Sequence, residues 1–146
     1  MNEKIKEQIR MVNYAVDGIV SVYGALAKKC GLSYNGLMVL YVMEEYEKCT
    51  QKQISDILQL PKSTVHSILL EFIKNEYVIL KTEEQNKKEK IIIFTIKGKK
   101  YLEDIMDKVH KVEINAMKKL GEDMCLQLVK SNTAFCEALK NEVENE

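Results

Sequence analysis

The sequence predicts a mainly α-helical chain that carries one small β-hairpin. Apolar residues recur at helical spacing near both ends of the chain and again through its middle. Between residues 77 and 96, two short β-branched runs flank a polar segment, which is the pattern of a two-stranded hairpin. With 146 residues, 46% of them hydrophobic, the chain is large enough for one domain with a real core.

Residues 1–30 predict one long amphipathic helix. Its apolar stripe consists of Ile5, Ile9, Val12, Val16, Ile19, Val20, Tyr23 and Leu26. Residues 34–46 predict a second helix, in which Leu37–Met43 is an unbroken apolar run. A helix that is apolar on all sides is expected to be buried on all sides.

Residues 51–75 predict two helices joined by a tight turn. Thr50 followed by Gln53 fits a capping box, so the first of these helices should start at Gln51. Ile54, Ile57 and Leu58 give it an apolar side. Pro61 lacks an N–H group and suits the first turn of the second helix.

The second of these helices has two distinct faces. Its apolar stripe consists of Val65, Ile68, Leu69, Phe72 and Ile73. The opposite face carries Ser63, His66, Ser67, Leu70 and Lys74. A short polar face on the second helix of a helix-turn-helix is what reading a DNA major groove requires.

The hairpin should follow at once. Tyr77–Lys81 and Ile91–Ile96 are the apolar strands, and the polar segment Glu83–Lys90 forms a charged tip that contains three lysines. A helix-turn-helix followed by a basic hairpin is a winged helix-turn-helix.

Residues 101–146 predict two further helices, separated near Gly121. Their apolar stripes consist of Ile105, Val109, Val112 and Leu120, and of Met124, Leu128, Phe135, Leu139 and Val143. Long terminal helices with apolar faces need each other or a second copy of the chain. A monomeric bundle is the alternative, and it is disfavoured because the winged segment fills its own small core.

The net charge of zero conceals an uneven distribution. Residues 51–100 hold ten lysines and six acidic residues, whereas residues 101–146 hold six lysines and ten acidic residues. The basic surplus therefore coincides with the helix-turn-helix and the hairpin.

These features together resemble the MarR family of bacterial transcriptional regulators, over nearly the whole chain. The matching pieces are Leu32-Ser33 at the start of the second helix, the run KSTVHSILLEFIKNEYV, and Phe94-Thr95-Ile96-Lys97-Gly98 after the hairpin. The resemblance implies a single domain over 1–146. In it, residues 31–100 form the winged helix-turn-helix lobe, and residues 1–30 and 101–146 form dimerisation helices.

The chain departs from the family pattern in the wing. Where the family usually has Asp-x-Arg, this sequence has Asn86 and Lys88. Lysine lacks the planar fork of arginine, so we expect weaker minor-groove readout and relatively more phosphate attraction. The glycine usual before the wing strand is Glu76, and if that site needs a positive φ, Asn75 is expected to adopt it.

The resemblance implies a homodimeric repressor on a pseudo-palindromic operator. We expect four residues of the second helix of the helix-turn-helix to read or position bases: Ser63, Thr64, His66 and Ser67. Phosphate contacts are expected from Lys62 and Lys74, and contacts beside the minor groove from Lys87, Lys88 and Lys90. Family members bind small-molecule effectors between the lobe and the dimer helices, where four tyrosines are candidates: Tyr14, Tyr23, Tyr34 and Tyr41.

Other interpretations stay open from the sequence. A winged helix can serve protein–protein contact instead of DNA binding. A metal sensor would use Cys30, Asp107 and His110, and a peroxide sensor would use an early cysteine, but buried inert thiols are the better default. No enzyme motif is present, and we expect no cofactor.

The sequence shows neither an apolar targeting segment nor a run of membrane-spanning length, so no membrane association is expected. Its cysteines are Cys30, Cys49, Cys125 and Cys136, and they form no CxxC pair. Scattered thiols of this kind indicate the reducing cytoplasm.

Overall fold

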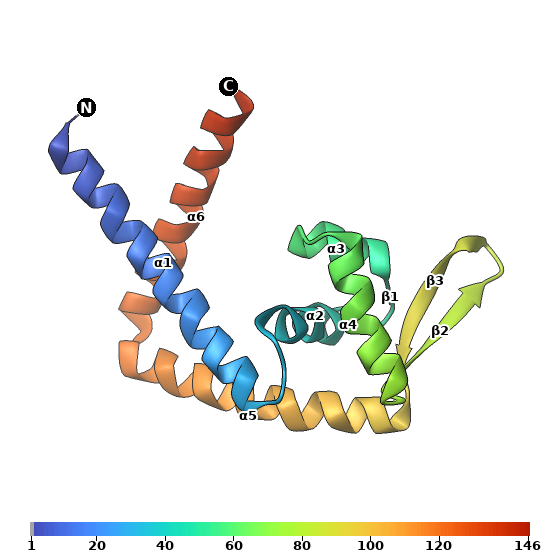
Figure 1. The fold of residues 1–146 in the computed structure, drawn as a ribbon. Helices are drawn as coiled ribbons and strands as arrows, with labels where there is room; N and C mark the ends of the chain where they lie inside the picture. The colour runs from blue at the N-terminus through green and yellow to red at the C-terminus, as the bar shows by residue number, and fades with distance from the viewer. Residues whose placement is uncertain (1) are drawn as a thin grey trace. The chain divides into compact units, whose positions relative to one another are not determined.

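The computed structural model describes residues 2–146, except for the side chain of Asn86. Over these residues the chain forms six helices and a three-stranded antiparallel sheet (Figure 1). The elements are α1 (Glu3–Lys29), α2 (Tyr34–Glu45), β1 (Cys49–Thr50), α3 (Gln51–Leu58), α4 (Lys62–Lys74), β2 (Val78–Glu83), β3 (Asn86–Phe94), α5 (Ile96–Leu120) and α6 (Glu122–Glu144). The predicted fold class is confirmed.

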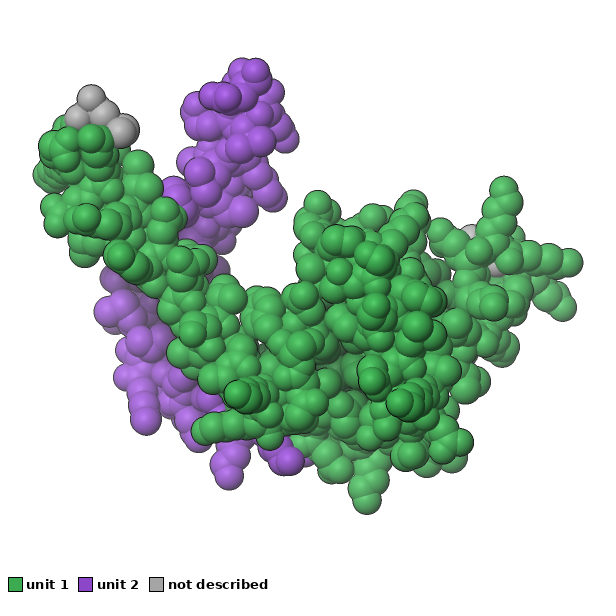
Figure 2. Space-filling view, in the orientation of Figure 1, with its two compact units in different colours: residues 1–106 green, residues 107–146 purple. Residues whose placement is uncertain are grey.

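The chain divides into two compact units, coloured separately in Figure 2. The first unit extends to Met106 and holds α1 to α4, the sheet and the start of α5. The second unit, Asp107–Glu146, holds the rest of α5 and α6. Among the described residues, no helix is long and apolar enough to cross a membrane.

Side-chain caps start the first three helices. Asn2 accepts a hydrogen bond from the backbone N–H of Lys4, and Ser33 accepts one from that of Gly36, both at 3.0 Å. In α2, the side chains of Leu37, Val39 and Leu40 are fully buried, as the apolar run predicts. The cap at Ser33 therefore starts α2 a few residues before its buried run.

The capping box at α3 is confirmed in both directions. The N–H of Gln53 donates to Thr50 Oγ1 at 3.1 Å, and the N–H of Thr50 donates to Gln53 Oε1 at 2.9 Å. The helix begins at Gln51, as predicted. After Leu58 the chain turns through Gln59 at φ 51°, and the hydroxyl of Ser55 donates to the carbonyl oxygen of Leu60. These contacts make the turn tight.

The core of the helix-turn-helix lies between α3, α4 and α2. Ile54 and Val65 are fully buried, and Leu69 and Phe72 are nearly so. The expectation that Ile57 belongs to the buried apolar side of α3 is wrong, because its side chain is 49% exposed. This short helix packs along one narrow side, where the small Ser55 turns inward to close the turn and Ile57 is left at the edge.

The hairpin differs from its predicted boundaries. The strands extend over the polar segment, so only residues 84–85 form the tip, and the lysines predicted for the tip lie on β3. Pairing is regular from Val78↔Phe94 to Thr82↔Lys90 and then shifts, so that Glu83 pairs with Asn86. Val78 and Ile92 at the base of the hairpin are buried, but its outer part is exposed, so polarity does not mark where its backbone pairing ends.

A third strand, β1, was not predicted. Cys49 pairs with Ile92 and Thr50 with Ile91, which places the start of α3 against the middle of β3. Two residues carry no periodic signal, so the sequence could not reveal this strand. Cys49 is 2% exposed, and burial raises the pKa of its thiol to about 11.

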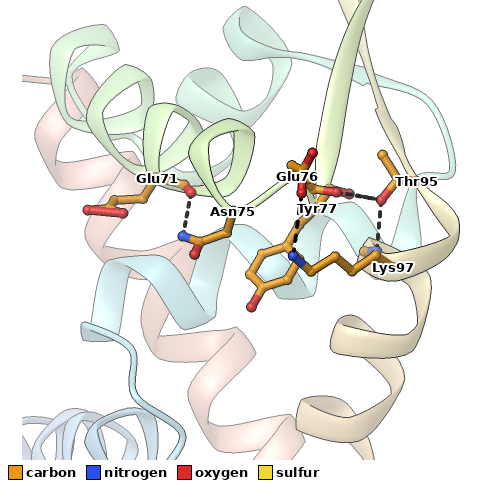
Figure 3. A network of polar contacts seen from close by, with 7 residues as sticks. Glu71, Asn75, Glu76, Tyr77, Thr95 and Lys97 are labelled. Atoms are coloured by element: carbon orange, nitrogen blue, oxygen red, sulfur yellow. Dashed lines mark hydrogen bonds and ion pairs between the residues drawn. The ribbon is translucent and has the colours of Figure 1, made fainter.

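The junction between α4 and β2 corrects another expectation. Glu76 itself has the positive φ, 62°, whereas Asn75 is at −84° and ends α4. Figure 3 shows how the junction is held: the hydroxyl of Thr95 donates to the carbonyl oxygen of Glu76 at 2.7 Å. The N–H of Thr95 donates to the carbonyl oxygen of Tyr77 at 3.0 Å. These bonds offset the cost of a left-handed glutamate.

The helix break near Gly121 is confirmed. Gly121 has φ 81° and separates α5 from α6. Within the second unit, His110 Nδ1 lies 3.1 Å from Glu113 Oε2, one turn apart on α5. The thiol of Cys125 lies 3.5 Å from the carbonyl oxygen of Met117.

Candidate nucleic-acid interface

The predicted polar face of α4 is open to solvent. Ser63, His66, Ser67 and Lys74 are exposed, and the side chain of Leu70 is 50% exposed. The opposite face enters the core, as described above, so α4 is fixed with this polar side outward. Thr64 differs from its neighbours because it is half-buried.

A hydrogen-bonded link joins the first turn of α3 to α4. The side-chain amide of Gln51 donates from Nε2 to the carbonyl oxygen of Lys62 at 3.2 Å. Its Oε1 lies 3.3 Å from Nδ1 of His66. On α4 itself, the hydroxyl of Ser67 donates to the carbonyl oxygen of Ser63 at 3.0 Å. The side chains of His66 and Ser67 are therefore held by local contacts before any ligand binds.

A basic groove lies between the two helices and the hairpin. Its volume is about 480 Å³, and its lining includes Lys52, Lys62, His66, Lys88 and Lys90. Four lysines and one acidic residue, Glu89, line this cavity, so its lining carries a net positive charge that favours a polyanion. We call this cavity, with its four lysines and His66, the wing groove.

The structure groups some of the predicted site residues and separates others. Lys62 and His66 from α4 meet Lys88 and Lys90 from β3 in the wing groove. Lys74 lies twelve residues beyond Lys62 on α4, roughly 18 Å away at the helical rise, so it belongs to the far end of this face. Lys87 is exposed on the hairpin, and the side chain of Asn86 lies outside the described residues.

Sequence reasoning missed Gln51 and Lys52. Both lie in the first turn of α3, and only the crossing of α3 and α4 brings them to residues more than ten positions later. The capping box predicted where α3 starts, but no local pattern indicates which later residues that turn will meet.

Polar contacts attach the start of α5 to the segment between α4 and the wing (Figure 3). Lys97 Nζ lies 3.8 Å from Glu76 Oε2 and 5.4 Å from the centre of the Tyr77 ring. The Tyr77 ring stacks on that of Tyr101, with centroids 3.9 Å apart. Burial, with smaller effects of Tyr77 and Cys30, raises the pKa of Tyr101 to about 12. These contacts tie the base of the wing to α5, and the N–H of Tyr77, which donates to the carbonyl oxygen of Phe72 at 2.9 Å, ties it to α4.

The four tyrosines proposed for an effector pocket lie in different environments. Tyr14 is 70% exposed on α1, whereas Tyr23, Tyr34 and Tyr41 are half-buried. Two further cavities of the first unit are lined by other residues. One, of about 440 Å³, includes Met43, Phe94 and Leu102, and the other, of about 370 Å³, includes Ser33, Tyr77 and Tyr101.

A metal centre finds no support in the described part of the chain. Over residues 2–146, no three histidine, cysteine, aspartate or glutamate side chains gather as a metal site requires. The cysteines there are unpaired thiols, buried at Cys49 and exposed at Cys136.

Comparison with known proteins agrees with this geometry. Residues 35–79 match a family described as the IclR helix-turn-helix domain. The HTH-type transcriptional regulator SarZ of Staphylococcus epidermidis is 33% identical over 81 residues, which are 56% of this chain and 55% of that protein. The chain thus spans about half the length of the curated relatives it matches.

Solved structures resemble the chain over its full length. NMB1585, a MarR family regulator from Neisseria meningitidis, is 22% identical and covers 100% of both chains with a TM-score of 0.81. A putative MarR family transcriptional regulator from Listeria monocytogenes, complexed with a 26mer DNA, is 21% identical. It covers 92% of this chain and 89% of its own, with a TM-score of 0.72. The predicted resemblance is confirmed for the fold.

Proposed function

Because the chain has the winged-helix fold of the MarR family regulators, we propose that it is a sequence-specific DNA-binding transcriptional regulator of the cytoplasm. The regulators it resembles are not enzymes. The observation that carries the proposal is the wing groove, where Lys62 and His66 of α4 face Lys88 and Lys90 of β3. A helix with an exposed polar face beside a basic hairpin fits a duplex, with the helix in the major groove and the hairpin along the adjacent backbone.

The start of α4 adds a phosphate contact to this arrangement. Pro61 caps the helix without a side-chain hydrogen bond, so the N–H groups of Lys62 and Ser63 remain for an outside acceptor. A phosphate oxygen is such an acceptor, and the adjacent Lys62 adds positive charge. Phosphate contacts of this kind set the register of the helix, while His66 and Ser67 reach the base edges.

We propose further that the regulator is a homodimer. On α1 the side chains of Ile5, Ile9, Val16 and Ile19 are 44–50% exposed. In the second unit, Phe135 is 42% exposed. Contiguous apolar faces of this length are rarely left in water. A second copy of the chain that covers them would place two recognition helices roughly 34 Å apart, one turn of a pseudo-palindromic operator.

We propose further that the protein represses transcription and that a small-molecule effector controls its binding to DNA. The effector would bind near Tyr23, Tyr34 and Tyr41 and change the spacing of the recognition helices. Tyr41 lies on α2, which packs against α1 as well as against α3 and α4, so a ligand there would act on both sides of α2. Titration with candidate small molecules, read as a change in operator affinity, tests this part separately.

The salt dependence of DNA binding tests the main proposal. Each lysine bound to a phosphate displaces counterions, so log Kd should depend linearly on log salt concentration. Replacing Lys88 and Lys90 by alanine should reduce the slope by about one unit for each lysine–phosphate interaction removed. The matched control replaces Lys130 and Lys140, two exposed lysines of α6, and should leave the slope unchanged.

The alternative is a winged helix that binds another protein. Leu70 on α4 and Ile79 on β2, 50% and 54% exposed, are the apolar residues that would favour it. A slope that is equal for the wild type, the wing variant and the control would exclude wing contact with DNA. A wild type that binds no duplex at any salt concentration would favour this alternative.

A further inference from the structure

The orientation of the Gln51 side chain is determined by its partner on α4. The carbonyl oxygen of Lys62 can only accept a hydrogen bond, so the group that contacts it at 3.2 Å is the amide nitrogen of Gln51. The amide oxygen consequently points the other way, to Nδ1 of His66 at 3.3 Å.

This orientation sets the tautomer of His66. The amide oxygen of Gln51 can only accept, so Nδ1 of His66 must carry the hydrogen that lies between them. A neutral imidazole has a single N–H group, so Nε2 keeps its lone pair. His66 is exposed, and the atom that it offers to a ligand is therefore a hydrogen-bond acceptor.

Ser67 also presents a hydrogen-bond acceptor to a ligand, for an independent reason. Its hydroxyl hydrogen is directed to the carbonyl oxygen of Ser63, one turn back, at 3.0 Å. A serine hydroxyl has one hydrogen and two lone pairs, so the outward side of Oγ is also an acceptor. Two neighbouring side chains on the exposed face of α4 thus present acceptors.

We propose that α4 selects base pairs whose major-groove edge offers an exocyclic amino group, and that Gln51 is the positioning residue for this choice. This inference rests on the proposed function as a DNA-binding protein. Adenine N6 and cytosine N4 are the amino donors in the major groove, whereas guanine O6 and N7 and thymine O4 are acceptors that would face the acceptors of His66 and Ser67.

Leu70 favours adenine over cytosine. It lies one turn after His66 on the same exposed face, and its side chain is 50% exposed. An A·T pair offers the amino group of adenine and the methyl group of thymine in the same groove. Acceptors at His66 and Ser67 with an apolar Leu70 beside them therefore match A·T pairs.

The experiment begins with operators selected from a pool of random duplexes by the full-length wild-type protein. The positions read by His66 are those at which His66→Ala loses base preference. Adenine should dominate there, followed by cytosine. Replacing that adenine by purine, which lacks the N6 amino group, should weaken wild-type binding roughly threefold to tenfold.

Gln51→Leu tests the positioning role. Leucine neither donates to the carbonyl oxygen of Lys62 nor accepts from Nδ1 of His66, so it removes the contact that orders the imidazole and its tautomer. The variant should therefore lose its preference for adenine over guanine at these positions. Gln85→Leu, at the tip of the wing, is the matched control and should leave base preference unchanged.

The outcomes separate this inference from the proposed function. If the wild type binds no duplex, the proposed function fails. If it binds specifically but prefers guanine at the His66 positions, or tolerates purine without loss, the acceptor polarity is wrong. If Gln51→Leu keeps the adenine preference, Gln51 does not position His66.

Discussion

Gly98 lies so close to Tyr77 that a Cβ built on it would overlap the carbonyl oxygen and carbonyl carbon of Tyr77. The contact places the first turn of α5 directly against the start of the wing. It is reinforced by Thr95, whose Oγ1 accepts from the N–H of Gly98 at 2.9 Å. The wing is therefore positioned by backbone contacts at its base.

Gly98→Ala should destabilise the protein. The added methyl group meets backbone atoms that cannot move aside easily, so the free energy of unfolding should fall by about 2–3 kcal/mol. Gly18→Ala, in α1, is the matched control because a Cβ there meets nothing within 4 Å, and it should gain up to about 1 kcal/mol. Urea unfolding at one fixed protein concentration measures both. A neutral Gly98→Ala would mean that the two backbones are not in contact.

Glu76→Gly should stabilise the junction between α4 and β2. Glycine adopts a φ of 62° without the penalty that glutamate incurs, so we expect a gain of up to about 1 kcal/mol. The ion pair with Lys97 is exposed and contributes little. Asn75→Gly should instead destabilise, because Asn75 is not left-handed and its side chain donates to the carbonyl oxygen of Glu71 at 2.8 Å. The reverse order of the two variants in thermal unfolding would contradict the assignment of the left-handed position.

Because the thiol of Cys49 is buried, we expect the folded protein to lose stability at alkaline pH. Burial raises the pKa of its thiol from 9.0 to about 11, so the folded chain holds this proton more tightly than the unfolded chain. Below pH 9 both states are protonated and the thiol contributes no pH dependence. Between pH 9 and 11 the unfolded chain releases the proton first, so the free energy of unfolding should fall as pH rises.

The comparison with Cys49→Ala isolates this effect. Other groups titrate equally in both proteins, so the variant should show a shallower decrease between pH 9 and 11 in urea unfolding. Parallel curves for the two proteins would show that the thiol of Cys49 is not perturbed in the folded state.

The apolar face of α1 predicts the oligomeric state. Ile9→Glu places a charge on a side chain that is 49% exposed in one chain, so a monomer would tolerate it within roughly 0.5 kcal/mol. In a homodimer that buries this face, the charge should dissociate the dimer or abolish folding. Arg10→Glu, on the exposed polar side of the same helix, is the control. Light scattering measures the mass, and a wild type that is monomeric at micromolar concentration would contradict the proposed dimer.

The sequence predicts most helices well because they begin or end on a local signal. The exception is α5, which begins at Ile96, a residue expected in the second strand of the hairpin. The Thr50 and Gln53 pair started α3 at the correct residue, and Gly121 separated α5 from α6. The burial of α2 followed from its unbroken apolar run. These features depend on residues within one turn of each other, so local patterns suffice.

The sequence-based predictions are wrong where contacts between residues far apart in the chain determine the structure. The polar stretch of β3 is a strand because β2 pairs with it, and β1 exists because Cys49 meets Ile92. The left-handed position fell on Glu76, where Thr95 supports the backbone from nineteen residues away. The contribution of Gln51 to the site likewise depends on a partner, His66, in the next helix.

Equilibrium binding to two duplexes tests the central claim, that the exposed face of α4 reads DNA. Fluorescence anisotropy at one salt concentration would compare a selected operator with a scrambled duplex, using the wild type and the His66→Ala variant. We expect the wild type to prefer the operator by at least roughly a thousandfold. The variant should lose about 1–3 kcal/mol on the operator and almost nothing on the scrambled duplex, with stability unchanged within roughly 0.5 kcal/mol. Equal binding of both duplexes by the wild type, or an equal loss on both in the variant, would contradict the claim.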